Sequence, residues 1–291
     1  MSSSSDTAPA TGFIRKPPRA SIPALCARCH SDAGLIRGYN PSLRIDQFAE
    51  YVSSIHGRRL FERGDTAVAV CVDCHPAHRT LPPSDPASSV FPLNVAETCG
   101  RCHADPVRMA DHEGGTGQLE LWRGSVHGQM MLEKGDVSAP TCNDCHGNHG
   151  AAPPGVWSVR RVCGQCHATM AEHFEASGHA SLLAGQDLGG CSTCHGHHDI
   201  QPPDDRLLLT TSRTVCLQCH DPDEAAASAF PRIALLFDSL EVAAADARQT
   251  LGVAADAGME VRNALFELDD LGTVFMKARS AIHSLAFEPV E

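Results

Sequence analysis

Seven short motifs that could bind a metal-containing cofactor occupy this chain and use all 14 of its cysteines. Each has the form Cys-x-x-Cys-His, the signal for covalent attachment of c-type haem, in which two thiols add to the vinyl groups and the histidine binds the iron. The cysteines that we expect to attach haem are Cys26, Cys29, Cys71, Cys74, Cys99, Cys102, Cys142, Cys145, Cys163, Cys166, Cys191, Cys194, Cys216 and Cys219. The histidines that we expect to be the proximal iron ligands are His30, His75, His103, His146, His167, His195 and His220.

The histidine after each cysteine pair makes this signal specific. Cys-x-x-Cys alone also occurs in zinc sites, redox dithiols and disulfide frameworks. Only 17 of the 291 residues are histidine, so chance does not place one after all seven pairs. A zinc ribbon has no need of that histidine. We therefore expect seven haem c groups, each with one iron.

An internal repeat organises the motifs. Each repeat has a first motif, a helix-like stretch that ends in a lone histidine, a second motif extended to Cys-x-x-Cys-His-x-x-His, and a Pro-Pro pair. The three repeats span residues 26–83, 99–154 and 163–203, and the seventh motif stands alone at 216–220. An aromatic residue precedes each lone histidine by five positions. Gly57 and Gly128 directly follow two of these histidines, which predicts that each lone histidine lies at the end of a helix that glycine caps.

Six histidines outside the motifs recur at matched repeat positions and are our candidates for distal iron ligands. They are His56, His78, His127, His149, His179 and His198. The alternative is that they are ordinary solvated or core histidines. His78 is too close in sequence to His75 to reach the opposite face of the same haem. We therefore expect His78, like His149 and His198, to bind a neighbouring haem, and the sequence leaves the pairing open.

Seven irons with two histidines each need a fourteenth ligand. The candidates are His112, His173, His197 and His283. His283 is the preferred one, because it lies on an expected C-terminal helix beside the apolar residues Ile282 and Leu285. The alternative for His283 is a histidine on the helix surface.

The composition predicts a mainly α-helical and irregular fold with little or no β-sheet. Aromatic residues are only 5% of the chain, and each repeat is too short to bury much apolar surface, so haem must supply much of the core. We expect an N-terminal extension at 1–25, a heptahaem domain at 26–220 and a helical hairpin at 221–291, interrupted between Gly252 and Gly258. We expect the apolar stripe of the hairpin to pack against the last haems or against its own partner helix. The alternative is that this stripe is a docking or oligomer surface.

Charge and hydropathy limit the classes of partner. The net charge of −12 disfavours nucleic acid and favours basic protein partners. No stretch of 18 apolar residues is present, so we expect no transmembrane segment. Haem is attached to such motifs outside the cytoplasm, which predicts a periplasmic or extracytoplasmic protein. Residues 1–20 show no apolar run typical of an export signal.

Two runs of residues resemble a known family. SVHGQMMLEKGDVSAPTCNDCHGNHG and LGGCSTCHGHHDIQPP resemble the periplasmic multihaem cytochromes c with doubled Cys-x-x-Cys-His motifs, and the resemblance covers residues 26–220. That group is related to quinol-oxidising tetrahaem cytochromes, and more distantly to octahaem and pentahaem reductases. The resemblance implies a partner such as a membrane quinol-oxidising module and an acceptor in the periplasm or beyond. The tail GMEVRNALFELDDLGTVFMKARSAIHSL is similar to the helical C-terminus of some members, which supports His283.

These observations predict an electron-transfer protein of a respiratory chain with no catalytic residues. Iron held by histidine on both sides is low-spin and has no open position, which favours electron transfer. The alternative is a multihaem reductase of nitrite, hydroxylamine or a sulfur oxyanion, which needs one iron with an open sixth position and acid groups nearby. A third hypothesis is a subunit of a larger complex or a haem filament, with the hairpin as its interface.

Overall fold

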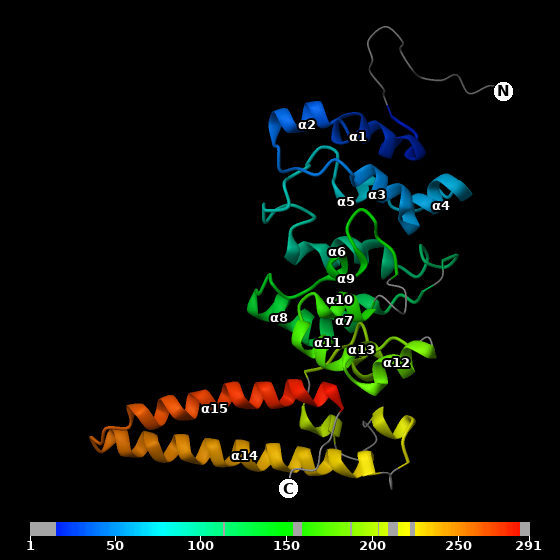
Figure 1. Cartoon of the computed structure of the whole chain (residues 1–291). Coiled ribbons are helices and arrows are strands. Elements are labelled where there is room, and N and C mark those ends of the chain that lie inside the picture. The colour runs from blue at the N-terminus through cyan, green and yellow to red at the C-terminus, as the bar shows by residue number, and fades with distance from the viewer. Residues whose placement is uncertain are drawn as a thin grey trace, which may run out of the picture. The chain divides into compact units, whose positions relative to one another are not determined.

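The chain folds into helices joined by irregular segments. The computed structural model describes residues 16–112, 114–153, 159–186, 188–202, 204–208, 215–221 and 225–285. Within these ranges it contains no β-strand, which confirms the predicted fold class (Figure 1). The chain divides into an N-terminal unit, Met1–Pro154, and a C-terminal unit, Gly155–Glu291. Repeats one and two lie in the first unit and repeat three in the second, whereas the domain limits expected from the sequence stay a prediction.

The N-terminal unit is built from short helices. In chain order they are η1 (Arg19–Ser21), α1 (Ile22–His30), α2 (Ala33–Tyr39), α3 (Gln47–Ser53), α4 (Ile55–Arg63), α5 (Cys71–Cys74), α6 (Pro92–His103), α7 (Gln118–Gly124), α8 (Val126–Lys134) and α9 (Cys142–His146). The Pro82-Pro83 pair lies between helices, as expected. Pro154, which belongs to the second predicted pair, lies outside the described residues.

The C-terminal unit joins a third set of short helices to two long ones. Its elements are α10 (Val159–Gly164), α11 (Ala168–Glu175), α12 (Gly178–Gly185), α13 (Cys191–His195), η3 (Asp205–Leu208), η4 (Val215–Gln218), α14 (Ala225–Asp256), α15 (Arg262–Ala281) and η5 (Ile282–Ser284). Residue 203, in the third predicted proline pair, lies outside the described residues.

Small hydrophobic clusters, one for each repeat, include residues on both sides of the lone histidine in the sequence. Each cluster contains the aromatic residue five positions before the histidine and an apolar residue four positions after it. The buried members are Ile22, Tyr51, Leu60, Val68 and Val70; Ala96, Trp122, Met131 and Ala139; and Phe174, Ala180 and Leu183. Cys71 and Cys142 pack against the first two clusters, so the attachment sites are in contact with the apolar core of their own repeat.

Each lone histidine is the second residue of a helix, not the last. The predicted helices before these histidines exist as α3, α7 and α11, but each is followed by a serine that stands at the N-cap position of the next helix. Ser54 and Ser125 also end α3 and α7, whereas Ala176 ends α11 before Ser177. His56, His127 and His179 therefore lie at the N-terminal ends of α4, α8 and α12. The expectation of a glycine cap directly after the histidine is wrong. The C-terminal caps of α4 and α8 are Gly64 and Gly135, with φ of 68° and 66°.

Gly57 and Gly128 are needed for a close approach between consecutive helices. A Cβ atom at Gly57 would lie 1.9 Å from the carbonyl oxygen of Tyr51, and one at Gly128 would lie 2.1 Å from that of Trp122. The helix before the lone histidine thus packs against the start of the next one with no room for a side chain. Repeat three has Ala180 at this position, and Ala180 is buried.

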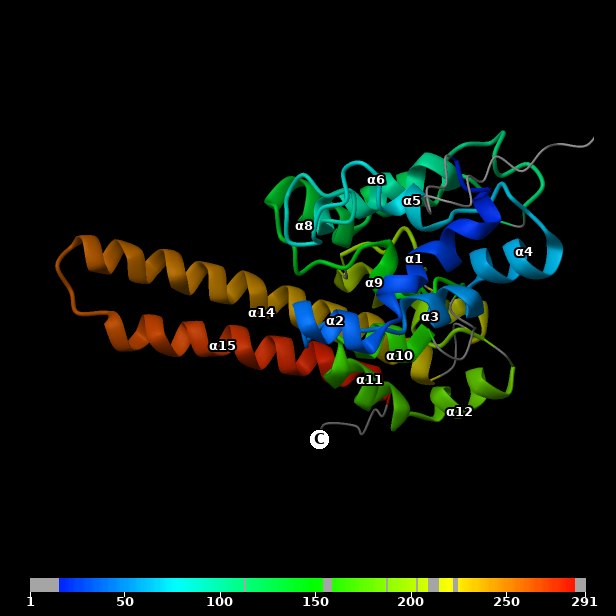
Figure 2. The ribbon, with the colours of Figure 1, turned by 90° about the horizontal axis from the view of Figure 1, so that it is seen from above.

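The two long C-terminal helices form the predicted hairpin. α14 and α15 lie side by side in both views and are joined at 257–261, where Gly258 has a φ of 86° (Figures 1 and 2). The helix break lies later than predicted, because α14 continues through Gly252 to Asp256. Phe237 and Phe275 hold the helices together with ring centres 6.3 Å apart. Among the described residues, no helix is both long and apolar enough to cross a bilayer.

Candidate haem-binding sites

The attachment motifs either form a short helix of their own or lie at the end of a longer helix. The second motif of each repeat forms its own short helix, α5, α9 or α13. The first motifs of repeats one and two occupy the last residues of α1 and α6, which end at His30 and His103. Both arrangements place the two cysteines on one turn of helix and the histidine directly after it. Two thiols and one imidazole thus project from a single turn, as attachment to one porphyrin edge requires.

An aspartate inside the second motif fixes the start of its helix in the first two repeats. Asp73 accepts a hydrogen bond from the backbone N–H of Val70 at 2.7 Å, and Asp144 accepts one from Thr141 at 2.8 Å. These bonds satisfy N–H groups at the beginning of the helix that no helical carbonyl can reach. The variable positions of the motif therefore hold the attachment turn in place, a role that the sequence analysis missed.

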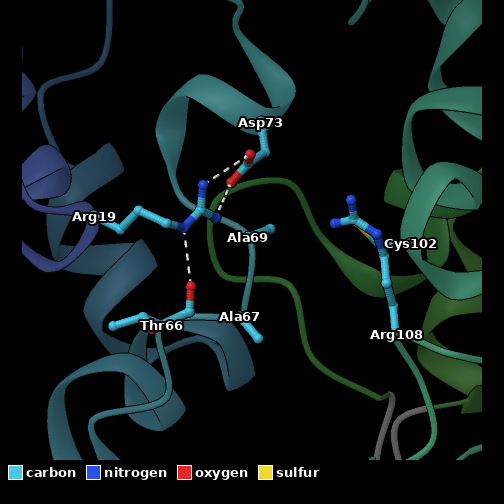
Figure 3. A pocket seen from close by; sticks show the side chains of 7 residues that line it. All are labelled: Arg19, Thr66, Ala67, Ala69, Asp73, Cys102 and Arg108. Carbon is cyan, nitrogen blue, oxygen red and sulfur yellow. Dashed lines mark hydrogen bonds and ion pairs between the residues drawn. The ribbon is translucent and has the colours of Figure 1, made fainter. Parts of the chain in front are cut away.

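Arg19 joins the start of the described chain to the second motif (Figure 3). Its guanidinium donates to the carbonyls of Thr66 and Val68 at 2.9 Å each and to both carboxylate oxygens of Asp73 at 2.6 and 3.3 Å. A cavity of about 290 Å³ lies beside this arginine and is bordered by Cys102, an attachment cysteine of the third motif. Space is therefore present next to that sulfur, and Arg108 borders it as well.

Two pairs of histidine rings face each other within the N-terminal unit. The ring centres of His56 and His103 are 6.0 Å apart, with an angle of 49° between the ring planes. Those of His75 and His149 are 6.3 Å apart, with an angle of 15°. In each pair one ring belongs to a Cys-x-x-Cys-His motif and the other to a recurring histidine outside the motifs.

The C-terminal unit contains two corresponding pairs. The rings of His179 and His220 have centres 5.8 Å apart and planes at 51°. His195 and His283 have centres 6.0 Å apart and planes at 25°. His283 lies in η5, directly after α15, so the hairpin brings this residue back to a motif 88 positions earlier.

These separations fit one iron between two imidazoles. A histidine nitrogen binds a transition metal at about 2 Å, and a ring centre lies roughly 1 Å from its nitrogen, so ligands on opposite sides of one metal have centres about 6 Å apart. The four observed separations lie between 5.8 and 6.3 Å. Direct stacking of two rings would bring them closer, and unrelated surface histidines would not repeat one distance. The donor set therefore fits haem c with two axial histidines.

Hydrogen bonds and burial prepare the imidazoles for metal binding. Nδ1 of His146 is 3.1 Å from the carbonyl oxygen of Ala152, and Nδ1 of His283 is 3.1 Å from that of Ser280. A proton held on Nδ1 by a carbonyl leaves Nε2 as the metal-binding nitrogen. Burial also lowers the pKa of several of these histidines and so favours the neutral ring. The affected residues are His56, His75, His103, His149, His179 and His195.

Thiols of successive motifs lie next to each other in the N-terminal unit. Burial, together with the charge and hydrogen bond of the neighbouring Cys26 thiol, raises the pKa of Cys71 to about 12. A hydrogen bond with Cys142, together with burial, raises the pKa of Cys99. Motifs one and two, and motifs three and four, are therefore in contact through their attachment sulfurs. Haem groups attached there would be neighbours in the order of the sequence.

The structure also places the other predicted site residues. His30 and His78 are exposed, whereas His127 on α8 and His198 are half-buried. No ring pair of about 6 Å is recorded in the described chain for His30 or for His78.

The other candidates for the fourteenth ligand differ in their surroundings. His112 is half-buried and close enough to His56 and His103 to lower the pKa of both. His173 lies half-buried on α11, and the Nδ1 of exposed His197 accepts a hydrogen bond from the N–H of His198 at 3.1 Å.

Comparison with known proteins supports haem attachment at part of the motifs. The family described as doubled CXXCH motif matches residues 135–172 and 179–225, which contain motifs four to seven. No curated protein and no solved structure matches the chain. The chain thus carries the haem-binding motifs of c-type cytochromes, and these motifs imply covalently bound haem c with iron.

Proposed function

We propose that this protein is a heptahaem c-type cytochrome that carries electrons along seven covalently bound haems, most of them with two axial histidines. The observation that carries the proposal is the set of four facing histidine pairs, each of which joins a motif to a histidine outside the motifs. When bound, haem supplies one-electron chemistry at iron. The chain would hold most of these groups through two sulfurs and two imidazoles, so that the surroundings of the iron would change little when its charge changes.

The repeat extends this assignment to two further histidines. His127 has the same place in α8 that His56 has in α4 and His179 in α12, two residues after a buried serine. His198 follows its motif at the spacing of His149. We therefore propose that both are distal ligands. Both are half-buried, as the paired histidines His56, His149 and His179 are.

The contacts between motifs support transfer along the sequence order. Electrons move between groups that lie close together, and the neighbouring sulfurs of Cys26 and Cys71, and of Cys99 and Cys142, place two pairs of attachment sites side by side. In the C-terminal unit, Cys194 is close enough to Cys216 for the charge of Cys216 to raise its pKa, after the larger effect of burial. This arrangement favours a conductor over a set of independent centres.

We propose electron transfer, not catalysis, as the activity. An iron with histidine on both faces has no position for a substrate, and the four facing pairs account for four of the seven motifs. The expected donor is a respiratory protein such as a membrane quinol-oxidising module, and the expected acceptor is periplasmic or extracellular. A net charge of −12 favours partners with a basic docking surface.

Absorption spectroscopy of the purified protein tests the proposal. The haem content per chain should be seven, the reduced protein should show sharp low-spin bands, and dithionite-reduced protein should pass electrons to a soluble acceptor. Bound zinc, bare thiols or a content of two or three haems would contradict the account. Turnover of nitrite or hydroxylamine, together with a strong high-spin ferric signal, would instead support a reductase.

A further inference from the structure

The four histidine pairs fall into two groups that differ in geometry. In the pairs His56–His103 and His179–His220 the ring planes are 49° and 51° apart. In the pairs His75–His149 and His195–His283 they are 15° and 25° apart. We call the first group the helix-start pairs and the second the near-parallel pairs. Each unit of the chain contains one pair of each group.

The helix-start pairs share a fixed local structure. The distal histidine is the second residue of a helix of eight or nine residues, and a buried serine precedes that helix. Ser54 is fully buried, donates to the carbonyl of Tyr51 at 2.6 Å and accepts from the N–H of Gly57 at 2.9 Å. Ser177 donates to the carbonyl of Phe174 at 2.6 Å. The serine thus fixes the angle between two helices and with it the direction of the histidine.

A helix start is an electrically positive environment. The N-terminus of a helix carries the equivalent of about half a positive charge, and side chains in a helix are tilted toward that end. A histidine at the second position therefore projects in the direction of the positive end. Positive potential at the iron disfavours the ferric state, which has one more positive charge than the ferrous state.

The near-parallel pairs have negative groups beside the distal histidine. His283 follows the 20-residue helix α15 and has its Nδ1 3.1 Å from the carbonyl of Ser280, near the negative C-terminal end of that helix. The Nδ1 of His149 is 3.8 Å from Glu50 Oε2. Arg44 pairs with Glu50 and with Asp46, so these three charges sum to −1. A negative neighbour on the Nδ1 side makes an imidazole a stronger donor and favours ferric iron.

We propose that Ser54, Ser125 and Ser177 are positioning residues that hold the distal histidines at helix starts and thereby divide the haems into two electronic classes. This inference rests on the proposed haem ligation. The irons of the helix-start pairs have the higher reduction potentials and those of the near-parallel pairs the lower ones. Since each unit contains both classes, the potential does not simply fall from one unit to the other.

A redox titration followed by electron paramagnetic resonance tests this division. The largest g-value of low-spin ferric haem rises as two axial imidazole planes turn away from parallel, so the two classes give separate signals. On stepwise reduction, the signals with the larger g-value should disappear first. Disappearance in the reverse order, or one signal class for all haems, would overturn the inference. Absence of low-spin signals of this kind would instead contradict the proposed function itself.

The substitution Ser54→Ala tests the role of the serine. Loss of the hydroxyl should lower the potential of one helix-start haem and change its g-value. The expected change in the reduction equilibrium is about two- to fivefold. This corresponds to about 20–40 mV, because a tenfold change is 59 mV for one electron. Ser54→Thr keeps a hydroxyl and should restore most of the potential.

A neighbouring serine supplies the matched control. Ser53 is exposed and donates to the carbonyl of Glu50 at 2.8 Å, so Ser53→Ala should leave all potentials unchanged. If Ser54→Ala does not fold, Ser177→Ala provides the same test. The Ser177 hydroxyl does not cap α12, so its removal should lower the free energy of unfolding by less. A normal potential and g-value in both folded alanine variants would overturn the role of the serines.

Discussion

Repeats one and two differ from repeat three in how the second motif is tied to the rest of the repeat. In repeat one the hydroxyl of Tyr51 donates to the carbonyl of Ala69 at 2.9 Å, and in repeat two the indole N–H of Trp122 donates to the carbonyl of Pro140 at 3.1 Å. Both carbonyls lie two residues before the first cysteine of the motif. The counterpart in repeat three is Phe174, which has no polar group to donate.

Repeat three is supported by the hairpin instead. Its motif has Thr193 where the others have Asp73 and Asp144, so the aspartate cap of the attachment helix is missing there. The helices α15 and η5 pack against α11, and η5 supplies the ring that faces His195. The comparison teaches that one constellation of cysteines and histidines can be held by hydrogen bonds within a repeat or by a separate pair of helices.

The largest difference between the repeats should appear when a distal histidine is replaced by alanine. His283→Ala should convert one haem to a high-spin form that binds carbon monoxide when reduced, because its second ligand is gone. His149→Ala should do the same for another haem. Only His283→Ala should also loosen the hairpin, measured as faster proteolysis at 257–261. Equal proteolysis of the two variants would contradict the dependence of repeat three on the hairpin.

Removal of the central aromatic residue should cost more in repeat two than in repeat three. Trp122→Ala removes a buried ring that packs in a cluster with Met131, 1% exposed, and a hydrogen bond to Pro140, so the free energy of unfolding should fall by about 3–5 kcal/mol. Phe174→Ala removes a ring from a cluster of three residues and should cost about 3 kcal/mol, the low end of the range for such substitutions. Denaturant unfolding of the haem-loaded protein measures both. A larger cost for Phe174→Ala would reverse the comparison.

Substitution of the residue after the lone histidine should lower stability more in repeat one than in repeat three. Gly57→Ala places a Cβ against the Tyr51 carbonyl, so α4 must move, and the expected loss of stability is about 1–3 kcal/mol with a spectral change at the haem of motif three. Ala180→Gly should cost only about 1 kcal/mol, through lower helix propensity. Thermal unfolding and the spectrum report both. An unchanged spectrum in a folded Gly57→Ala protein would argue against tight coupling of α4 to that haem.

The smallest effects should come from the arginines of the hairpin. Arg279 donates to Asp205 and to Glu241 at 2.7 Å each and lies 5.1 Å from the centre of the Phe237 ring. Because its side chain is partly exposed, Arg279→Ala should lower stability by only about 1 kcal/mol. Arg248 pairs with Asp269 in a more exposed position, and Arg248→Ala should have almost no effect. Equal losses of stability in thermal unfolding would contradict a greater stabilising role for Arg279 than for Arg248.

The sequence predicts the chemistry of the sites better than their positions. Cysteines and histidines at fixed short spacing identify the attachment turns, and the helical fold with its C-terminal hairpin follows from composition and periodicity and is confirmed. The sequence does not predict which rings face each other, because His75 faces His149, which lies 74 positions later in the chain. No local pattern encodes such a contact, which depends on how whole repeats pack.

Some features were visible in the sequence but were misread. A glycine after a helical stretch usually caps it, yet Gly57 serves a close approach to a carbonyl that only the folded chain reveals. Ser54, Ser125 and Ser177 stand two residues before the lone histidines in every repeat. Serine at a helix start is a known capping signal, so this recurrence would have placed the histidines at the correct end of the helix.

The intact mass of the mature protein tests the central claim most directly. The account predicts that the mass exceeds that of the polypeptide by seven haem groups and that no free thiol remains to react with an alkylating reagent. A mass that corresponds to the bare polypeptide, to bound zinc or to fewer haems with alkylatable cysteines would contradict the account of a seven-haem electron carrier.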